Sequence, residues 1–199
     1  MSAQELLALI VFSTAIAFTP GPNTTLSAAL AANGGMRQAL RFILAVPVGW
    51  GLLLLASVAG LGTLVQAAPV LRGLIKAAGL AYMLWLAWKL ARTDRLVGAA
   101  GQRLTVGFVQ GVLLQFLNIK AWMNALMISA GWVTVAEPIG PRVAVVLPLM
   151  MAYGLASNFT YALIGSALRH WLAQGRRLLV FNRVLAAVLV ATAAWMAVL

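Results

Sequence analysis

The sequence predicts an all-α membrane protein with six transmembrane helices. Of its 199 residues, 63% are hydrophobic and only 9% are charged, and the mean hydropathy is +0.99. Soluble domains are about 45–50% apolar and about 25% charged, so this chain has too few charges to cover a water-exposed surface. A membrane-spanning helix needs about 20 apolar residues, and six such helices with short loops fill a chain of this length. We therefore expect residues 1–199 to form a single transmembrane domain.

Long apolar runs mark the six helices in order. Each run is long enough to cross the hydrocarbon core, and none shows the alternation of a barrel strand. The connections between them are short and carry most of the charged residues. The runs are residues 5–30, 40–65, 70–91, 106–133, 143–168 and 178–199.

The basic residues predict how the helices are oriented. Lys and Arg number 14 against 3 Asp and Glu, which gives a net charge of +11. Ten of the basic residues lie in the first, third and fifth loops: Arg37, Arg41, Lys89, Arg92, Arg95, Arg103, Arg169, Arg176, Arg177 and Arg183. Three lie toward the opposite side: Arg72, Lys76 and Arg142. The positive-inside rule places the odd loops in the cytoplasm and both termini outside. Loop charge explains the basicity, so we expect no nucleic-acid partner.

The two halves of the chain share a pattern of punctuating residues. In the second run Pro47 follows Arg41 by six residues, and in the fifth run Pro148 follows Arg142 by the same spacing. The first and fourth runs each contain a polar interruption partway across. Because each half has three helices, the second half enters from the opposite side of the membrane. We expect a 3+3 inverted-topology repeat, with halves of about 1–95 and 103–199, as in secondary transporters.

The first run is predicted to be an interrupted helix. Pro20, Gly21 and Pro22 remove two backbone donors and cannot continue a helix, so we expect two half-helices that end near Thr19 and restart near Asn23. Side chains suited to capping the new N-terminus follow: Asn23, Thr24 and Thr25. A half-helix N-terminus attracts an anion, and the carbonyls freed at 17–19 attract a cation. The alternative is a plain proline kink relieved by neighbouring helices.

Lys120 lies in the middle of the fourth run. It is about 14 residues from one end and about 12 from the other, roughly 18 Å at 1.5 Å per residue, which is too far for its side chain to reach the interface. None of the three acids, Glu5, Asp94 and Glu137, lies deep in a run. Lys120 must therefore meet the carbonyls of a broken helix, a water-filled cavity or the carboxylate of a ligand. It either caps carbonyls structurally or contacts a substrate.

Other polar residues within the runs complete the candidate binding site. We expect Asn23, Thr24, Gln115, Asn118 and Lys120 to bind substrate, although each amide could instead bond only between helices. Asn118 and Lys120 are two residues apart, so they share a face only where the helix is locally unwound. Further polar residues in the runs are Gln110, Asn124, Asn158 and Tyr161.

Several chemistries lack the residues they need. The chain has no cysteine and one histidine, His170, at the edge of a run, so it offers no metal site and no Ser–His hydrolase site. It has no buried carboxylates for a divalent cation and no glycine-rich nucleotide loop. We expect no cofactor and no enzymatic activity, which leaves a carrier for a small polar solute that bears negative charge.

At these residues the chain resembles the lysine-exporter and homoserine-threonine-exporter (LysE/RhtB-type) family of amino-acid efflux proteins. The resemblance rests on Phe18-Thr-Pro-Gly-Pro-Asn-Thr24, Gly34-Gly-Met-Arg-Gln38, the stretch 79–89 and Gln115-Phe-Leu-Asn-Ile-Lys-Ala-Trp122. It implies a bacterial inner-membrane exporter of amino acids that is driven by the proton gradient, and the positive-inside rule then makes the two outside termini periplasmic. Ile119 stands where the family has proline, so we expect a milder break in the fourth run. Asn-x-Lys without proline also resembles the cysteine/O-acetylserine exporter branch.

The resemblance and the residues lead to one hypothesis of function. A substrate carboxylate suits Lys120 and the half-helix that begins at Asn23, and the lack of buried acids favours neutral amino acids over cationic ones. Lys120 is also the only titratable candidate at mid-membrane for the coupling proton. The alternatives are an exporter of another organic anion or toxic solute, and a membrane assembly subunit without transport. A homo-oligomer is compatible with the sequence.

Overall fold

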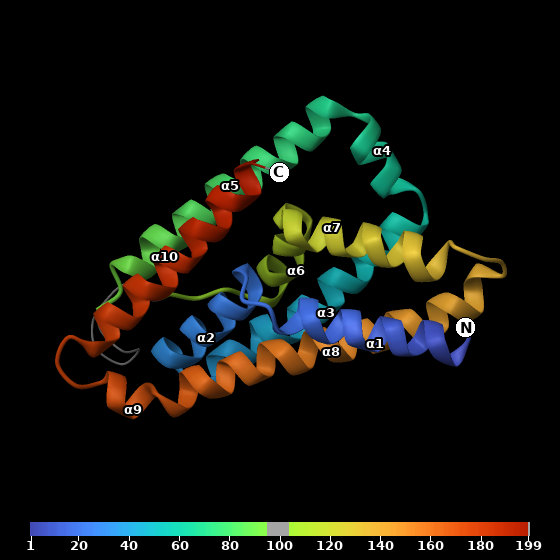
Figure 1. The fold of residues 1–199 in the computed structure, drawn as a ribbon. Coiled ribbons are helices and arrows are strands. Elements are labelled where there is room, and N and C mark those ends of the chain that lie inside the picture. The colour runs from blue at the N-terminus through green and yellow to red at the C-terminus, as the bar shows by residue number, and fades with distance from the viewer. Residues whose placement is uncertain (95–103, 199) are drawn as a thin grey trace.

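The computed structural model describes residues 1–94 and 104–198, and every regular element in these ranges is a helix (Figure 1). The elements are α1 (Ala3–Phe18), α2 (Pro22–Gly34), α3 (Met36–Val58), α4 (Leu61–Ala67), α5 (Pro69–Ala91), α6 (Phe108–Leu117), α7 (Ile119–Ile128), the π-helical turn η1 (Ser129–Val133), α8 (Ile139–Ala167), α9 (Arg169–Leu172) and α10 (Arg177–Val198). The predicted all-α class is confirmed.

The number of membrane spans depends on how the broken helices are counted. In the described ranges four helices, α3, α5, α8 and α10, are individually long and apolar enough to cross a bilayer. Two bent pairs, α1 with α2 and α6 with α7 and η1, pass the same test when each pair counts as one span, which gives up to six. This agrees with the six predicted runs. The first, third, fifth and sixth runs match their helices to within a few residues at each end.

The second run departs from its prediction at its C-terminal end. We expected one helix over 40–65, but α3 ends at Val58 and a separate short helix, α4, begins at Leu61. Gly60 between them has φ +92°, the left-handed conformation that ends helices and that glycine adopts without strain. The chain therefore turns between α3 and α4, and it turns again between α4 and α5 at the apex of the ribbon in Figure 1.

Both predicted interruptions are real breaks. The axes of α1 and α2 differ by 51°, and those of α6 and the α7–η1 helix differ by 72°. The expectation of a milder break in the fourth run is therefore wrong. Asn118 makes the break without a proline, because its backbone is extended (φ −93°, ψ 102°) and its carbonyl accepts the amides of Ala121 and Trp122 at 2.9 and 3.1 Å.

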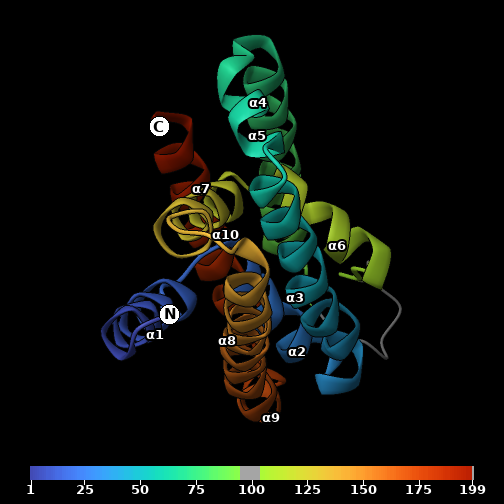
Figure 2. The same ribbon diagram turned by 90° about the vertical axis from the view of Figure 1, so that its right-hand side faces the viewer.

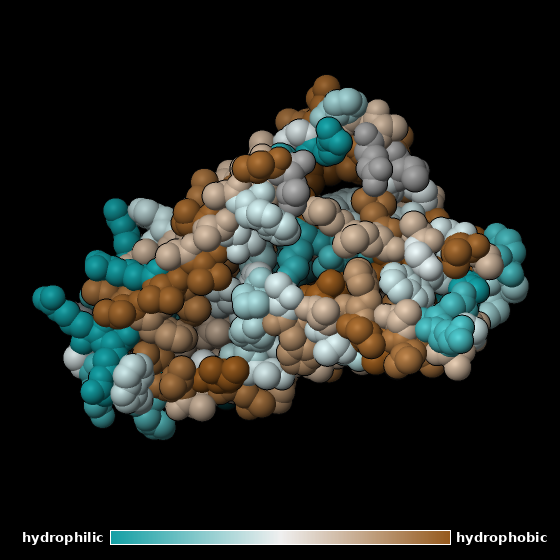
Figure 3. Space-filling view, viewed as in Figure 1, coloured by the Kyte–Doolittle hydropathy of each residue, from teal (hydrophilic) through white to brown (hydrophobic). Residues whose placement is uncertain are grey.

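The connections that were predicted to share one side of the membrane lie at one end of the molecule. Figure 1 shows the α2–α3 turn, the C-terminal end of α5 and helix α9 together, with the N-terminus and the 134–138 connection at the other end. Figure 3 shows hydrophilic residues gathered at both ends and a largely hydrophobic band between them. Arg95, Arg103 and the predicted boundary between the halves lie outside the described residues.

Each half places its helices in the same order: a broken helix, a helix that contains a proline, and a final helix. Pro47 lies inside α3 and Pro148 inside α8, while the final helices α5 and α10 pack along each other. This order is the one that the predicted repeat requires, and the inverted symmetry itself stays a prediction.

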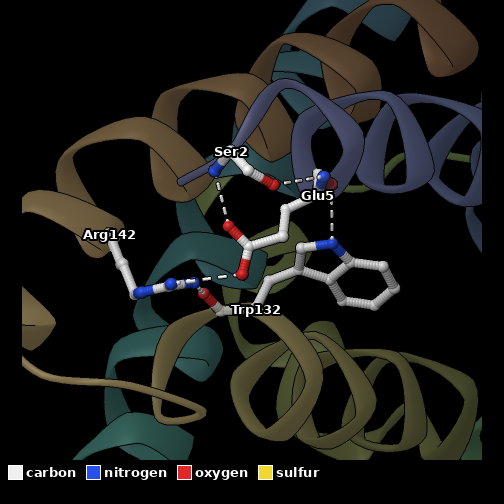
Figure 4. Close-up of polar contacts among 4 residues, drawn as sticks. All are labelled: Ser2, Glu5, Trp132 and Arg142. Carbon is white, nitrogen blue, oxygen red and sulfur yellow. Dashed lines mark hydrogen bonds and ion pairs between the residues drawn. The ribbon is translucent and has the colours of Figure 1, made fainter.

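Helix α1 lies at the edge of the bundle with α8 as its neighbour (Figure 2). A cluster at its N-terminal end holds it to the second half of the chain (Figure 4). The Glu5 carboxylate accepts a bond from Arg142 at 3.2 Å and one from the Ser2 amide at 2.6 Å. The Trp132 indole donates to the Glu5 carbonyl at 3.0 Å, and Arg142 also donates to the Trp132 carbonyl at 3.1 Å.

Candidate functional site

The carbonyl end of the first break is occupied by donors from the second half of the chain. Helix α1 ends at Phe18, whose carbonyl accepts the Tyr161 hydroxyl at 2.9 Å. The next carbonyl, that of Thr19, accepts the Lys120 ammonium at 3.2 Å. The freed carbonyls thus attract a cation as predicted, and in this structure that cation belongs to the protein.

The amide end of the first break is the N-terminus of α2. Pro22 takes the first helical position, where its missing N–H costs nothing, and the Thr24 hydroxyl accepts the Gly21 amide at 3.0 Å. Thr24 is therefore the capping side chain, whereas Asn23 and Thr25, which we also expected to cap, do not. Helix geometry leaves the amides of Asn23 and Thr24 without an intrahelical acceptor, so they form the anion-attracting end of α2.

Asn23 is held in place by Gln115. Their amides bond reciprocally: the Asn23 nitrogen donates to the Gln115 oxygen at 2.8 Å, and the Gln115 nitrogen donates to the Asn23 oxygen at 3.2 Å. Gln115 is fully buried and also donates to the Gly111 carbonyl at 3.1 Å. Gln115 consequently positions Asn23 and ties the two breaks together, and it does not line the cavity described below.

The second break brings Asn118 and Lys120 to the same space. Residues two positions apart in a continuous helix point to different faces. The extended backbone at Asn118 removes that restriction for Asn118 and Lys120. Lys120 packs its side chain against Gly21, where a Cβ atom would lie 3.2 Å from the lysine nitrogen. The Asn118 side-chain oxygen is buried and has no hydrogen-bond partner among the described residues. An unpaired buried acceptor costs about 1–3 kcal/mol, so it is a ready site for a ligand donor.

A cavity of about 80 Å³ lies where the two breaks meet α3 and α8. The predicted residues Asn23, Thr24, Asn118 and Lys120 all line it, together with Gly21 and Pro22 of the break. Pro20 lies beside them in the chain but does not line the cavity. Lys120 is the single titratable side chain among the lining residues. Figure 3 shows hydrophilic atoms at the surface in the middle of this face, where Figure 1 places the two breaks.

Part of the cavity wall was missed by the sequence argument. The additional polar side chains are Asn124, Ser157 and Asn158, and the additional apolar ones include Val46, Trp50 and Met150. Asn124 and Asn158 were noted only as polar residues within the runs, and Asn124 could have been assigned to the site, because it follows Lys120 by four residues and therefore lies on the same face of α7. The residues of α3 and α8 carry no such signal, since only the packing of those helices against the breaks brings them to the site.

The acidic side chains lie away from the cavity. Glu5 is in the first turn of α1, Asp94 follows the end of α5, and Glu137 lies between η1 and α8. None of them lines the cavity. In the part of the chain that the structure describes, Lys120 consequently has no carboxylate partner, and the cavity holds one positive charge.

Two broken helices that meet around a cavity with polar lining residues, in a bundle of up to six spans, are the arrangement typical of a multi-pass membrane transporter. The model of the family described as LysE type translocator matches residues 14–198, and the chain belongs to this family. This confirms the resemblance seen in the sequence, and it identifies the protein as a translocator rather than an enzyme.

Relatives of known function resemble the chain along nearly its whole length. It is 31% identical over 193 residues to the cysteine/O-acetylserine efflux protein of Klebsiella pneumoniae, which covers 96% of this chain and 95% of the relative. The protein of the same name from Salmonella typhimurium is 30% identical over 194 residues, and that from Escherichia coli K12 is 29% identical over 191 residues, with 96% of each chain covered in both comparisons. No solved structure gives a significant match.

Proposed function

We propose that the protein exports small neutral amino acids from the cytoplasm across the bacterial inner membrane, driven by the proton gradient. The observation that carries the proposal is the charge of Lys120, which has no carboxylate partner among the described residues, in a cavity whose lining residues include no acid. A substrate carboxylate would accept the lysine ammonium and the amides at the start of α2. The efflux proteins named above, which are similar along 96% of the chain, support an amino-acid substrate and outward transport.

The charge of the cavity favours a neutral substrate. A zwitterionic amino acid adds no net charge, and its carboxylate is paired with Lys120. A cationic amino acid would add a second positive charge beside Lys120, with no carboxylate in the cavity to balance it. The substrate ammonium can donate to the unpartnered oxygen of Asn118.

The proposal of proton coupling rests on two observations, the family resemblance and the position of Lys120. The family resemblance implies an exporter driven by the proton gradient, and Lys120 is the one titratable group that lines the cavity. We infer that Lys120 exchanges a proton during the transport cycle. Efflux from proteoliposomes should then accelerate when a pH gradient is imposed, and the Lys120→Met variant should lose that acceleration.

Binding of a panel of labelled amino acids to the purified protein tests the central proposal. Lys120→Met should weaken binding by roughly 10- to 100-fold, because a hydrogen bond to a charged group contributes about 1.5–3 kcal/mol. Lys76→Met is the matched control, since Lys76 lies on α5 and does not line the cavity. The proposal fails if no amino acid binds, or if Lys120→Met binds as tightly as the control.

The orientation has its own test. The chain lacks cysteine, so a single introduced cysteine reports its own position. Ala197→Cys near the end of α10 should react with a membrane-impermeant thiol reagent on intact spheroplasts, because we place both termini in the periplasm. Ala173→Cys after α9 should react only after lysis. The reverse pattern would overturn the proposed orientation.

A further inference from the structure

Helices α3 and α8 contribute one wall of the cavity, and this wall is separate from the break residues that would bind the charged groups of an amino acid. It consists of Val46 and Trp50 from α3, with Met150, Gly154, Ser157 and Asn158 from α8. No side chain in this wall carries a charge. On the proposed function, the side chain of the substrate faces this wall.

The polar groups of this wall are already satisfied by the protein. The Gly154 carbonyl accepts the Asn158 amide at 2.8 Å and the Ser157 hydroxyl at 3.3 Å. The Asn158 oxygen accepts the Ser27 hydroxyl at 2.8 Å. Since these groups do not need a ligand, the wall offers an incoming side chain mainly apolar contacts with Val46, Trp50 and Met150.

Gly154 has no packing reason to be a glycine. A Cβ atom there would have Pro47 as its nearest neighbour, at 3.9 Å, which is an ordinary contact. Gly165 on the same helix differs, because its Cβ would lie 2.2 Å from the Ala28 carbonyl oxygen. Glycine inside a helix is about 0.5–1 kcal/mol less favourable than alanine, and among the described glycines without a close Cβ neighbour Gly154 is the one that also lines the cavity. Gly154 lines the cavity, and a Cβ atom there would have only Pro47 within 4 Å.

We propose that Gly154 is a specificity-determining residue that sets the longest side chain the transporter accepts. The inference rests on the proposed function and names the residue that limits the length of the substrate side chain within the class of small neutral amino acids. A cavity of about 80 Å³ has room for roughly five to eight water-sized groups. That is close to the number of non-hydrogen atoms in a small amino acid. A methyl group at position 154 would take up part of this room without disturbing the backbone.

A straight-chain series of amino acids tests this proposal. Alanine, 2-aminobutyrate, norvaline and norleucine differ by one methylene each, and each competes with a labelled substrate for binding to the purified protein. Gly154→Ala should move the length limit toward shorter members and weaken the longest one that the wild type binds by roughly 10-fold or more, the usual effect of one methylene in a pocket. Val46→Ala, which enlarges the same wall, should move the limit toward longer members.

The matched control is Gly140→Ala on the same helix, where a Cβ atom has open space and the residue does not line the cavity. It should leave the profile of the series unchanged. The proposal is overturned if Gly154→Ala binds the series with the wild-type profile, or if Gly140→Ala shifts the profile equally. If the wild type binds none of the series and no other amino acid, the proposed function fails instead, and the two failures are therefore distinguishable.

Discussion

Gly79 allows α5 to lie directly against the second break. A Cβ atom at this position would lie 2.0 Å from the carbonyl oxygen of Leu117, the last residue of α6. Ordinary contacts begin near 3.4 Å. In Gly79→Ala the new methyl group and the Leu117 carbonyl, next to the break at Asn118, must therefore move apart by about 1.4 Å. Overpacking of this kind costs about 1–3 kcal/mol, and the helix propensity of alanine returns about 0.8–1 kcal/mol of it.

The same helix contains the control. A Cβ atom at Gly73 has no neighbour within 4 Å, so Gly73→Ala should gain helix propensity without a clash. The two alanine variants should therefore differ in stability by about 1–3 kcal/mol, with Gly79→Ala the less stable. Thermal unfolding in detergent, followed by fluorescence-detected size exclusion, measures the difference. Equal melting temperatures would refute the reasoning, because they would show that α5 does not approach Leu117 this closely.

Two further substitutions separate binding from stability. Gly21→Ala should weaken amino-acid binding several-fold and leave the melting temperature nearly unchanged. The new Cβ would lie 3.2 Å from the Lys120 nitrogen, so it displaces only the flexible end of that side chain. Equal binding by Gly21→Ala and the wild type in an equilibrium assay would contradict this. Asn182→Ala should lower stability by about 1–3 kcal/mol, since it removes the donor that Asn182 provides to the buried side-chain oxygen of Asn33 and to the carbonyl of Thr93. An unchanged melting temperature for Asn182→Ala would show that this buried cluster contributes little.

The local chemistry of the first break was readable from the sequence. Prolines cannot continue a helix in any environment, so the predicted end near Thr19 and restart near Asn23 fall within one residue of the observed Phe18 and Pro22. The deep position of Lys120 in a chain with few acids likewise required a polar partner, and the Thr19 carbonyl is one of the partners foreseen.

The sharp bend of the second break and the wall that α3 and α8 contribute to the cavity could not be predicted from the sequence in this way. Ile119 gives no sign of a break, because it is the backbone conformation of Asn118 that ends α6, and that conformation depends on tertiary packing. Gln115 was assigned to substrate, but its partner is Asn23, 92 positions away in the chain. Met150 and Gly154 look like any residues of an apolar helix until α8 is packed against the breaks. Only long-range contacts decide these assignments.

The anchoring of α1 has a consequence for how the protein is made. The side-chain bonds that tie α1 and the following Thr19 to other described elements all reach into the second half, to residues between Lys120 and Tyr161. Those partners lie 101–143 positions later in the chain. Helix α1 therefore finds these polar partners only after residues 120–161 have been synthesised. Its polar anchoring therefore has to follow the synthesis of α8, although α2 and α3, which adjoin it in the chain, are made long before.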